Sequence, residues 1–367
     1  MTNPGKHRVN GYNNAKITPC IALAIAILTN LGCGKTDEAP DVSHLDGSFS
    51  LTRTEQILFS IDTLASEESV RSIFTQHETF WDLYFSVIIP PATDTTYQSA
   101  QHSSIDTLLD KPWVPIVRDP YMRAIAESVS QDYTDMSDIN AQLTTAFQYL
   151  QYYFPGNRVP NVYTLVSGFG YFPFIFEDGE RDGLGISLEM FLGSDFPYRS
   201  FVGNVNAFSD YLIRTYNRDH VAKRTVEVLV DDLVGPSPGD KLIDMMIHNG
   251  IKLYIIEHLM PDLSDTILFE LNPKQLAWCE SNELNLWAHF LKDDLLYSNE
   301  FSEIQKLISP APGIPGMPSE APGGVANWTG WRIIHALTEK DPKVKMLDLL
   351  SIQDAQAVVE AARYRPR

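Results

Sequence analysis

Cysteine is scarce in this chain of 367 residues, which contains only Cys20, Cys33 and Cys279. No two of them form a C-x-x-C pair. This scarcity excludes a disulfide-rich scaffold and a cysteine-based zinc finger. The fold must therefore rest on its hydrophobic core, and Cys279, in a helical pattern, is expected to be a small buried residue of that core.

Basic residues are also in short supply, with 28 lysines and arginines against 47 aspartates and glutamates and a formal net charge of −19. A surface of this sign repels the phosphate backbone of nucleic acids and the head groups of anionic lipids. The composition therefore predicts no nucleic-acid partner. It leaves a solvated surface or a basic protein partner.

Motifs for metal and covalent chemistry are missing as well. None of the nine histidines stands four residues from another, so no HExxH helix places two imidazoles on one face. The chain has no Gly-x-Ser-x-Gly elbow and no glycine-rich phosphate loop after a strand. We therefore expect no catalytic residue, no metal ligand and no cofactor.

The chain has no apolar run long enough to span a bilayer; the run Ile17–Leu28 has the length of a signal sequence. A basic start precedes it, and small Gly32 precedes Cys33. This order predicts a lipoprotein signal over residues 1–32, with Cys33 acylated and anchored in a membrane. The alternative is an ordinary secretory signal followed by a chance cysteine.

Residues 33–48 are polar after the lipidated cysteine and predict a flexible tether, followed by a single domain over residues 49–367. Apolar residues at helical spacing, punctuated by proline and glycine, predict mostly helices in this domain. The expected helices lie within 49–87 and over 121–129, 139–154, 205–214, 220–233, 240–259, 273–294 and 325–339, with a short one after Pro342.

The periodicity changes in the middle of the chain, where residues 159–166, 171–176 and 184–190 are rich in β-branched and aromatic side chains. They predict three strands, with a turn-rich connection over 177–183. The expected fold class is α+β, a mostly helical domain with a small central sheet.

The helical segment Leu242–Tyr254 leaves two interpretations open. Asp244 and His248 stand four residues apart and could share a helix face as ligands, although no third ligand is evident. In the favoured interpretation they are polar positions on a core helix, and Gly250 allows another helix to approach closely.

A possible partner surface lies near the C-terminus. The loop Ser309–Pro322 holds five prolines, and the helix after it carries Trp328 and Trp331 three residues apart, with Arg332 beside them. Tryptophan and arginine are frequent anchors of interfaces. Core packing of both indole rings is the alternative.

Several segments in a fixed order resemble the gliding motility lipoprotein GldB family of the Bacteroidota. They cover nearly the whole chain after the tether and are specific as an ordered set rather than singly. These segments are Val162–Phe169, Gly185–Tyr198, Leu242–Ile247, Gln275–Glu283, Leu295–Ser298, Trp328–Trp331 and Arg363–Pro366.

The resemblance implies a role in the envelope machinery for surface motility and its associated secretion system. It also implies a distant likeness to zincin-type zinc peptidases, with the helix from His220 in the place of their metal helix. The catalytic residues of such peptidases are absent. Asn249 stands where an active relative would place a glutamate ligand, and Ile251 where the family commonly has lysine.

We therefore expect a non-enzymatic lipoprotein with a degenerate zincin-like domain that binds another component of the cell envelope. It would be held by lipid on the periplasmic side of the inner or outer membrane. Two alternatives remain: a cryptic metal-dependent hydrolase of zincin type, and a small-molecule binder using the groove beside the sheet.

Overall fold

The computed structural model describes residues 39–89, 111–203 and 208–366. Cys33, the predicted signal and residues 33–38 of the predicted tether lie outside these ranges, as do residues 205–207 of one predicted helix. Residues from Asp41 onward form a single compact unit.

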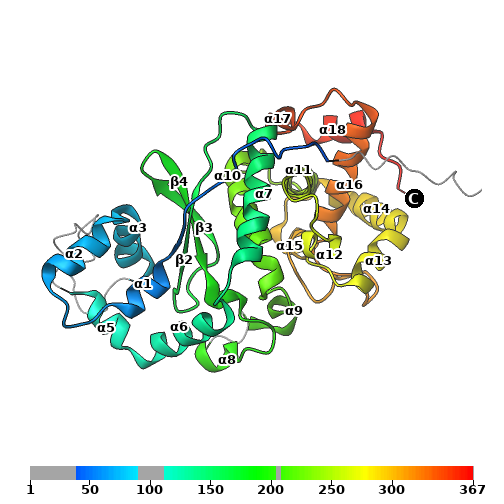
Figure 1. The fold of residues 1–367 in the computed structure, drawn as a ribbon. Helices are drawn as coiled ribbons and strands as arrows, with labels where there is room; N and C mark the ends of the chain where they lie inside the picture. The colour runs from blue at the N-terminus through cyan, green and yellow to red at the C-terminus, as the bar shows by residue number, and fades with distance from the viewer. Residues whose placement is uncertain (1–38, 90–110, 204–207, 367) are drawn as a thin grey trace, which may run out of the picture. The chain divides into compact units, whose positions relative to one another are not determined.

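A small mixed sheet occupies the centre of the unit (Figure 1). Its strand order is β1 (Leu51–Arg53), β2 (Asn161–Leu165), β4 (Arg181–Ser187) and β3 (Phe174–Asp178). The first three strands are parallel, and β3 pairs antiparallel with β4. The α+β class predicted from the sequence is confirmed.

Aromatic side chains and glycines alternate across one face of this sheet. Phe174 and Phe176 lie over Gly185 and Gly183 of β4, where a Cβ atom would come within 2.8 Å of either ring. Phe176 lies beside Tyr163, onto which Phe80 stacks with centroids 5.0 Å apart. The missing glycine side chains therefore let helix α3 (Glu78–Leu83) cover this face.

Long helices lie on the other side of the sheet, with α10 in contact with both β3 and β4 (Figure 1). Between β1 and β2 the chain forms α1 (Thr54–Ser60), α2 (Glu67–Thr75), α3, the π-helical turn η1 (Tyr84–Ile88), α5 (Trp113–Arg118), α6 (Pro120–Asp132) and α7 (Ser137–Tyr153). After β4 come η3 (Leu188–Phe191), α8 (Tyr198–Phe201), α9 (Asp210–Ile213), η5 (Arg218–His220), α10 (Val221–Val234) and α11 (Leu242–Leu259).

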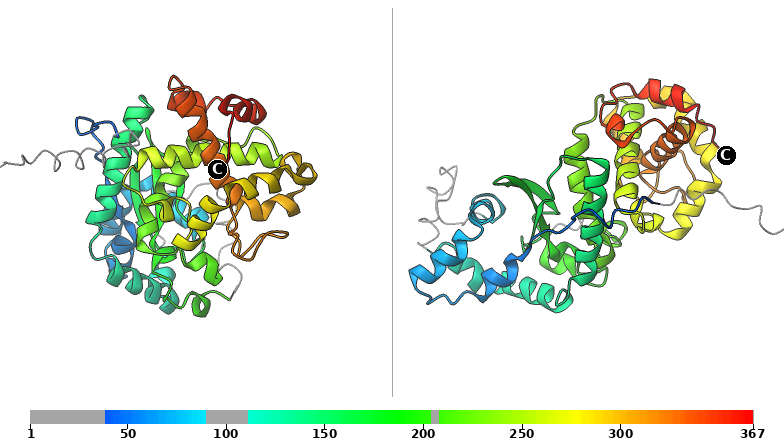
Figure 2. Two further views of the ribbon diagram at one scale, coloured as in Figure 1. Left: turned by 90° about the vertical axis from the view of Figure 1, so that its right-hand side faces the viewer. Right: turned by 45° about the horizontal axis from the view of Figure 1, so that its top comes forward.

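The remaining helices pack around α11 and α16. Helix α11 also contacts α7 and α10, and these three helices lie side by side in Figure 2. Apolar residues on all sides of α11 bury it at the centre of this group. The helices after it are α12 (Asp265–Leu268), α13 (Pro273–Ser281), α14 (Glu283–Leu291), η6 (Lys292–Tyr297), α15 (Phe301–Ile308), α16 (Val325–Lys340), α17 (Met346–Leu349) and α18 (Ala355–Ala362).

The structure corrects several expected boundaries. Residues 51–53 form a strand where helix was expected, and one helix expected over 273–294 is two, separated at Asn282. The expected long turn over 177–183 is mostly strand, because β3 and β4 are joined directly at Gly179 and Glu180. Gly183 in β4 resembles a turn residue in sequence and was therefore placed in the turn.

The described end of the predicted tether packs as part of the domain. Val42 is 6% exposed, and Gln148 and Gln151 of α7 donate hydrogen bonds to the carbonyl oxygens of Leu45 (2.9 Å) and Asp46 (2.6 Å). The segment therefore belongs with α7, ahead of the predicted domain boundary at residue 49.

Candidate functional site, a charged pocket among helices

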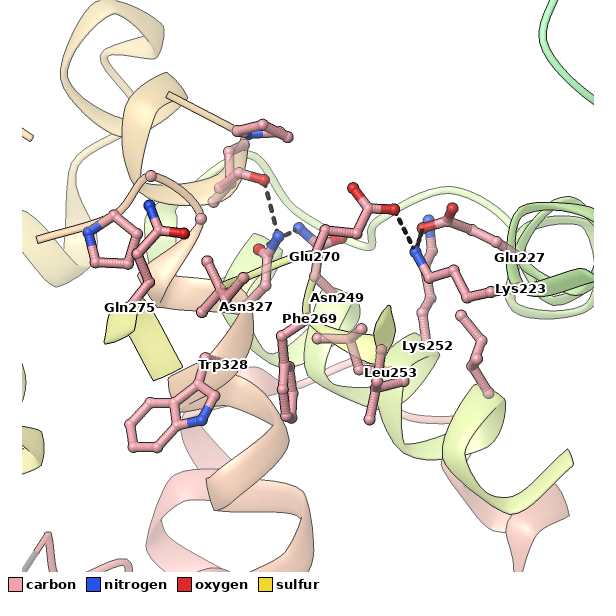
Figure 3. A pocket seen from close by; sticks show the side chains of 18 of the residues that line it. Lys223, Glu227, Asn249, Lys252, Leu253, Phe269, Glu270, Gln275, Asn327 and Trp328 are labelled. Carbon is pink, nitrogen blue, oxygen red and sulfur yellow. Dashed lines mark hydrogen bonds and ion pairs between the residues drawn. The ribbon is translucent and has the colours of Figure 1, made fainter. Parts of the chain in front are cut away.

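A pocket of about 270 Å³ opens among the C-terminal helices. Helices α10 and α11 form one side, and the turn after α12 and the N-terminal end of α16 form the other. Pro310, Ala311 and Pro322 of the proline-rich loop also line it. Figure 3 shows Lys223, Glu227 and Glu270 at one side and Gln275 at the other.

Two cations and two carboxylates form a closed ring beside the pocket. The Lys223 ammonium lies 3.0 Å from Glu227 and 2.8 Å from Glu270. The Arg224 guanidinium lies 3.0 Å from Glu227 and 2.8 Å from Glu270. Each carboxylate thus bridges the same two cations, and burial of the ring makes every contact count for more than it would on the surface.

Helical spacing and one unusual backbone conformation produce this ring. Lys223 and Glu227 stand four residues apart on α10, and Arg224 lies between them at a spacing of three from the same glutamate. Glu270 follows α12 with a φ of +53°, in the left-handed region that is uncommon for residues other than glycine. The ion pairs with α10 hold it there.

Burial and the two cations act in opposite directions on Glu227. Burial alone would raise the pKa of its carboxyl group, but Lys223 and Arg224 outweigh it and lower the pKa from 4.5 to about 2. Glu227 is therefore ionised throughout the physiological range. A carboxylate with so low a pKa accepts protons poorly, which disfavours a role as general base.

Arg214 lines the pocket without a carboxylate partner. Among the ion pairs of the described residues it has none; its Nε donates to the carbonyl oxygen of Tyr211 (2.9 Å) and its terminal nitrogen to that of Glu270. Burial lowers the pKa of this guanidinium, partly offset by Glu270. Its hydrogen bonds within the described residues go to carbonyl oxygens, while Glu270 acts on its charge without a direct ion pair.

Two asparagines form the middle of the pocket (Figure 3). Asn249 of α11 donates its amide hydrogen to the side-chain oxygen of Asn327 (2.9 Å), and Asn327 donates to the carbonyl oxygen of Ile308 (2.8 Å). Asn249, singled out in the sequence as the replacement of a ligand glutamate, therefore pairs with an amide.

The three residues predicted as a partner surface make different contacts on α16, although the Arg332 guanidinium lies over the Trp328 ring, 5.8 Å from its centroid. Trp328 is 3% exposed and lines the pocket. Trp331 is half-buried and donates its indole hydrogen to Glu257 at 2.8 Å. Arg332 is half-buried, 3.0 Å from the Glu283 carboxylate. The structure thus brings only Trp328 to the pocket, together with the proline-rich loop.

The other sequence candidates are scattered. Asp244 caps the start of α11, accepting from the Lys241 backbone amide at 3.3 Å, and His248 is buried. Across the described ranges, no three histidine, cysteine, aspartate or glutamate side chains gather so that they could hold a metal ion. Cys279 is fully buried, as expected.

Two buried histidines are expected to make the fold acid-sensitive. Burial lowers the pKa of His220 and of His248 from 6.5 to about 4, helped at His248 by Lys252. As pH falls from 6.5 towards 4, the unfolded chain binds protons that the folded protein does not, so stability is lost. The loss is up to about 3 kcal/mol per histidine.

Urea unfolding at pH 7 and pH 4.5 measures this loss. The His248→Gln variant should lose less stability between the two pH values than the wild type, whatever its stability at pH 7. Replacement of the exposed His44 by Gln is the matched control and should leave the pH dependence unchanged. An equal loss in wild type and His248→Gln would contradict the assignment.

Sequence reasoning did not find the ion-pair ring or Arg214. Lys223, Arg224 and Glu227 look like an ordinary charged helix surface, and Glu270 is more than forty residues away. The sequence did contain one signal for the ring, because Lys223 and Arg224 stand within the apolar face of a helix. Charges buried in this way need partners of opposite sign.

The comparisons with known proteins give one match. No curated protein and no solved structure matches the chain. None of the helices in residues 39–89, 111–203 and 208–366 combines the length and apolar character needed to cross a bilayer. The model of the gliding motility protein GldB family matches residues 35–366. Because this match covers nearly the entire chain, the protein belongs to the GldB family of gliding motility proteins.

Proposed function

We propose that this protein is a lipid-anchored component of the gliding motility machinery, and of the secretion machinery associated with it, that acts by binding another protein of the cell envelope. Family membership supports the motility role and the envelope location. The basic start, the short apolar run and Gly32-Cys33 support an anchor at Cys33.

The pocket chemistry carries the proposal that the protein binds rather than catalyses. The charged side chains of the ring are already paired, and Glu227 is held ionised with a pKa of about 2. Such groups can hold a ligand but are poorly suited to moving protons near neutral pH. A zincin-type hydrolase remains the competing function, and stoichiometric zinc in the purified protein would favour it.

The proposed partner surface is the N-terminal part of α16 with the loop before it. Proline restricts the free conformations of the loop Ser309–Pro322, so less entropy is lost when a partner orders it. Trp331 and Arg332 are half-buried and retain surface for contact. Trp328 would contribute from inside the pocket.

The Cys33→Ala variant tests the anchor and the role together. We expect this protein to leave the detergent phase, to fail to restore gliding in a strain that lacks the gene, and to lose its envelope partner in mild-detergent co-purification. Two acyl chains anchor a protein stably, and no other membrane attachment is proposed here.

The control is Cys279→Ala, which removes a thiol from the core and leaves the anchor intact. Trp331→Ala in the same co-purification tests the surface, and we expect reduced recovery of the partner. Detergent partitioning and full gliding by Cys33→Ala would refute the anchor, and gliding that is unaffected by deletion of the gene would refute the motility role.

A further inference from the structure

The charges that line the pocket do not cancel. Four cationic side chains, Arg214, Lys223, Arg224 and Lys252, line it together with three acidic ones, Glu227, Asp231 and Glu270. Lys252 is paired with Asp231 at 2.9 Å, and the ring is neutral. The excess positive charge therefore resides on Arg214, in a chain whose formal net charge is −19.

A partly buried guanidinium that makes no direct ion pair can be stabilised further by an anion. Arg214 donates to two carbonyl oxygens, makes no ion pair among the described residues and has further N–H groups available, although Glu270 acts on its charge. The ion that completes the pocket should carry about one negative charge. A phosphate group carries a charge of about −1.5 to −2 at neutral pH. Glu227 and Glu270 would therefore repel a phosphate more strongly than they would repel a single carboxylate.

Two side-chain amides line the same pocket as Arg214. The Asn249 side-chain oxygen and the Gln275 side-chain nitrogen make no hydrogen bond within the described residues, while the other ends of both amides are used. The first can accept from a peptide N–H and the second can donate to a peptide C=O. Figure 3 shows both residues on the pocket wall, on either side of Asn327.

The remaining wall is apolar and the space is small. Leu253, Phe269 and Trp328 line it. About 270 Å³ lies just below the range of typical small-molecule sites, so the pocket accepts the end of a chain and not a folded surface. Apolar walls of this kind suit the last side chain of an extended peptide.

We propose that the pocket binds the C-terminal carboxylate and last peptide unit of a partner polypeptide, with Arg214 holding the carboxylate and Asn249 and Gln275 holding the amide. Capture of a chain end by fixed hydrogen-bond donors is a known mode of peptide recognition. This inference rests on the proposed binding function and specifies the ligand of the same site.

The test measures binding of a labelled hexapeptide pool to the full chain in detergent, with free C-termini in one pool and C-terminal amides in the other. We expect binding of the free acids, at least tenfold weaker binding of the amides, and competition by free-acid peptides. Equal binding of both pools overturns the proposal. Equal competition by acetate shows a site for any small carboxylate, and stronger competition by inorganic phosphate shows an anion site; both outcomes overturn it.

Two variants locate the site. Arg214→Gln should weaken binding of the free acids at least tenfold, and the exposed Arg123→Gln should not. Gln275→Glu adds a negative charge to the wall while keeping the helix cap, because glutamate serves equally at that position of a capping box. It should also weaken binding at least tenfold, against the exposed control Gln131→Glu.

If Arg214→Gln does not fold, Gln275→Glu alone tests whether peptides bind in this pocket. Unchanged peptide binding by a folded Arg214→Gln or Gln275→Glu protein overturns the assignment of the peptide site to the pocket. The same experiments distinguish the peptide proposal from the proposed motility role. Absence of peptide binding by the wild-type protein, with gliding and partner recovery intact, refutes only the proposed peptide ligand. Normal peptide binding with gliding unaffected by deletion of the gene refutes the motility role.

Discussion

Gly330→Ala is expected to destabilise the protein by more than the ~1–3 kcal/mol usual for overpacking. A Cβ atom at Gly330 would overlap the carbonyl oxygen of Met246 and lie 2.8 Å from its carbonyl carbon. Both are backbone atoms of α11, so no side-chain rotation relieves the contact and the two helices must separate. The better helix propensity of alanine, worth about 1 kcal/mol, does not offset this.

Chemical denaturation of purified Gly330→Ala measures the effect. Gly313→Ala is the matched control, since a Cβ atom there meets nothing within 4 Å, and it should change stability by less than about 0.5 kcal/mol. Gly250→Ala should resemble Gly330→Ala, because its Cβ would lie 2.6 Å from the Gly330 carbonyl oxygen. Both changes separate the same helices, so the double variant should lose less than the sum. Full stability of Gly330→Ala would show that α11 and α16 do not meet here.

The contact at Gly250 illustrates what the sequence could predict. A glycine inside a strongly apolar helix pattern indicates close approach by another backbone, and the structure confirms the close packing predicted at Gly250. Its partner could not be named, because Gly330 lies eighty residues further on. Pairing of distant residues depends on the tertiary fold, which a local pattern does not encode.

The sheet shows the same limit. Strand β2 has the β-branched composition typical of a buried strand and was predicted within two residues of its ends. Strand β1 is only three residues long and is followed directly by a helix. It forms because β2 pairs with it, so its own sequence does not predict a strand. In the site, the predicted residue Trp328 lines the pocket, whereas the ring of charges depends on Glu270 being folded against α10.

Glu270→Gln is expected to destabilise the protein by ~3–5 kcal/mol, the cost of removing one partner from a buried ion pair. Glu270 is 8% exposed and accepts from Lys223 and Arg224, each at 2.8 Å. Glutamine keeps the shape but not the charge, so Glu227 alone faces two cations. The Lys223 side chain is only 2% exposed, and water cannot replace the lost carboxylate.

Urea unfolding at pH 7 measures this cost, and Glu180→Gln is the matched control. Glu180 also forms an ion pair, 3.0 Å from Arg158, but its side chain is 90% exposed, so its loss should cost no more than about 1 kcal/mol. The double variant Glu270→Gln with Lys223→Met restores the charge balance around Glu227 and should recover much of the lost stability. A variant that loses no more than the control would mean that the ring does not form. A double variant less stable than Glu270→Gln would mean that Lys223 contributes through its other contacts and not as the counter-ion of Glu270.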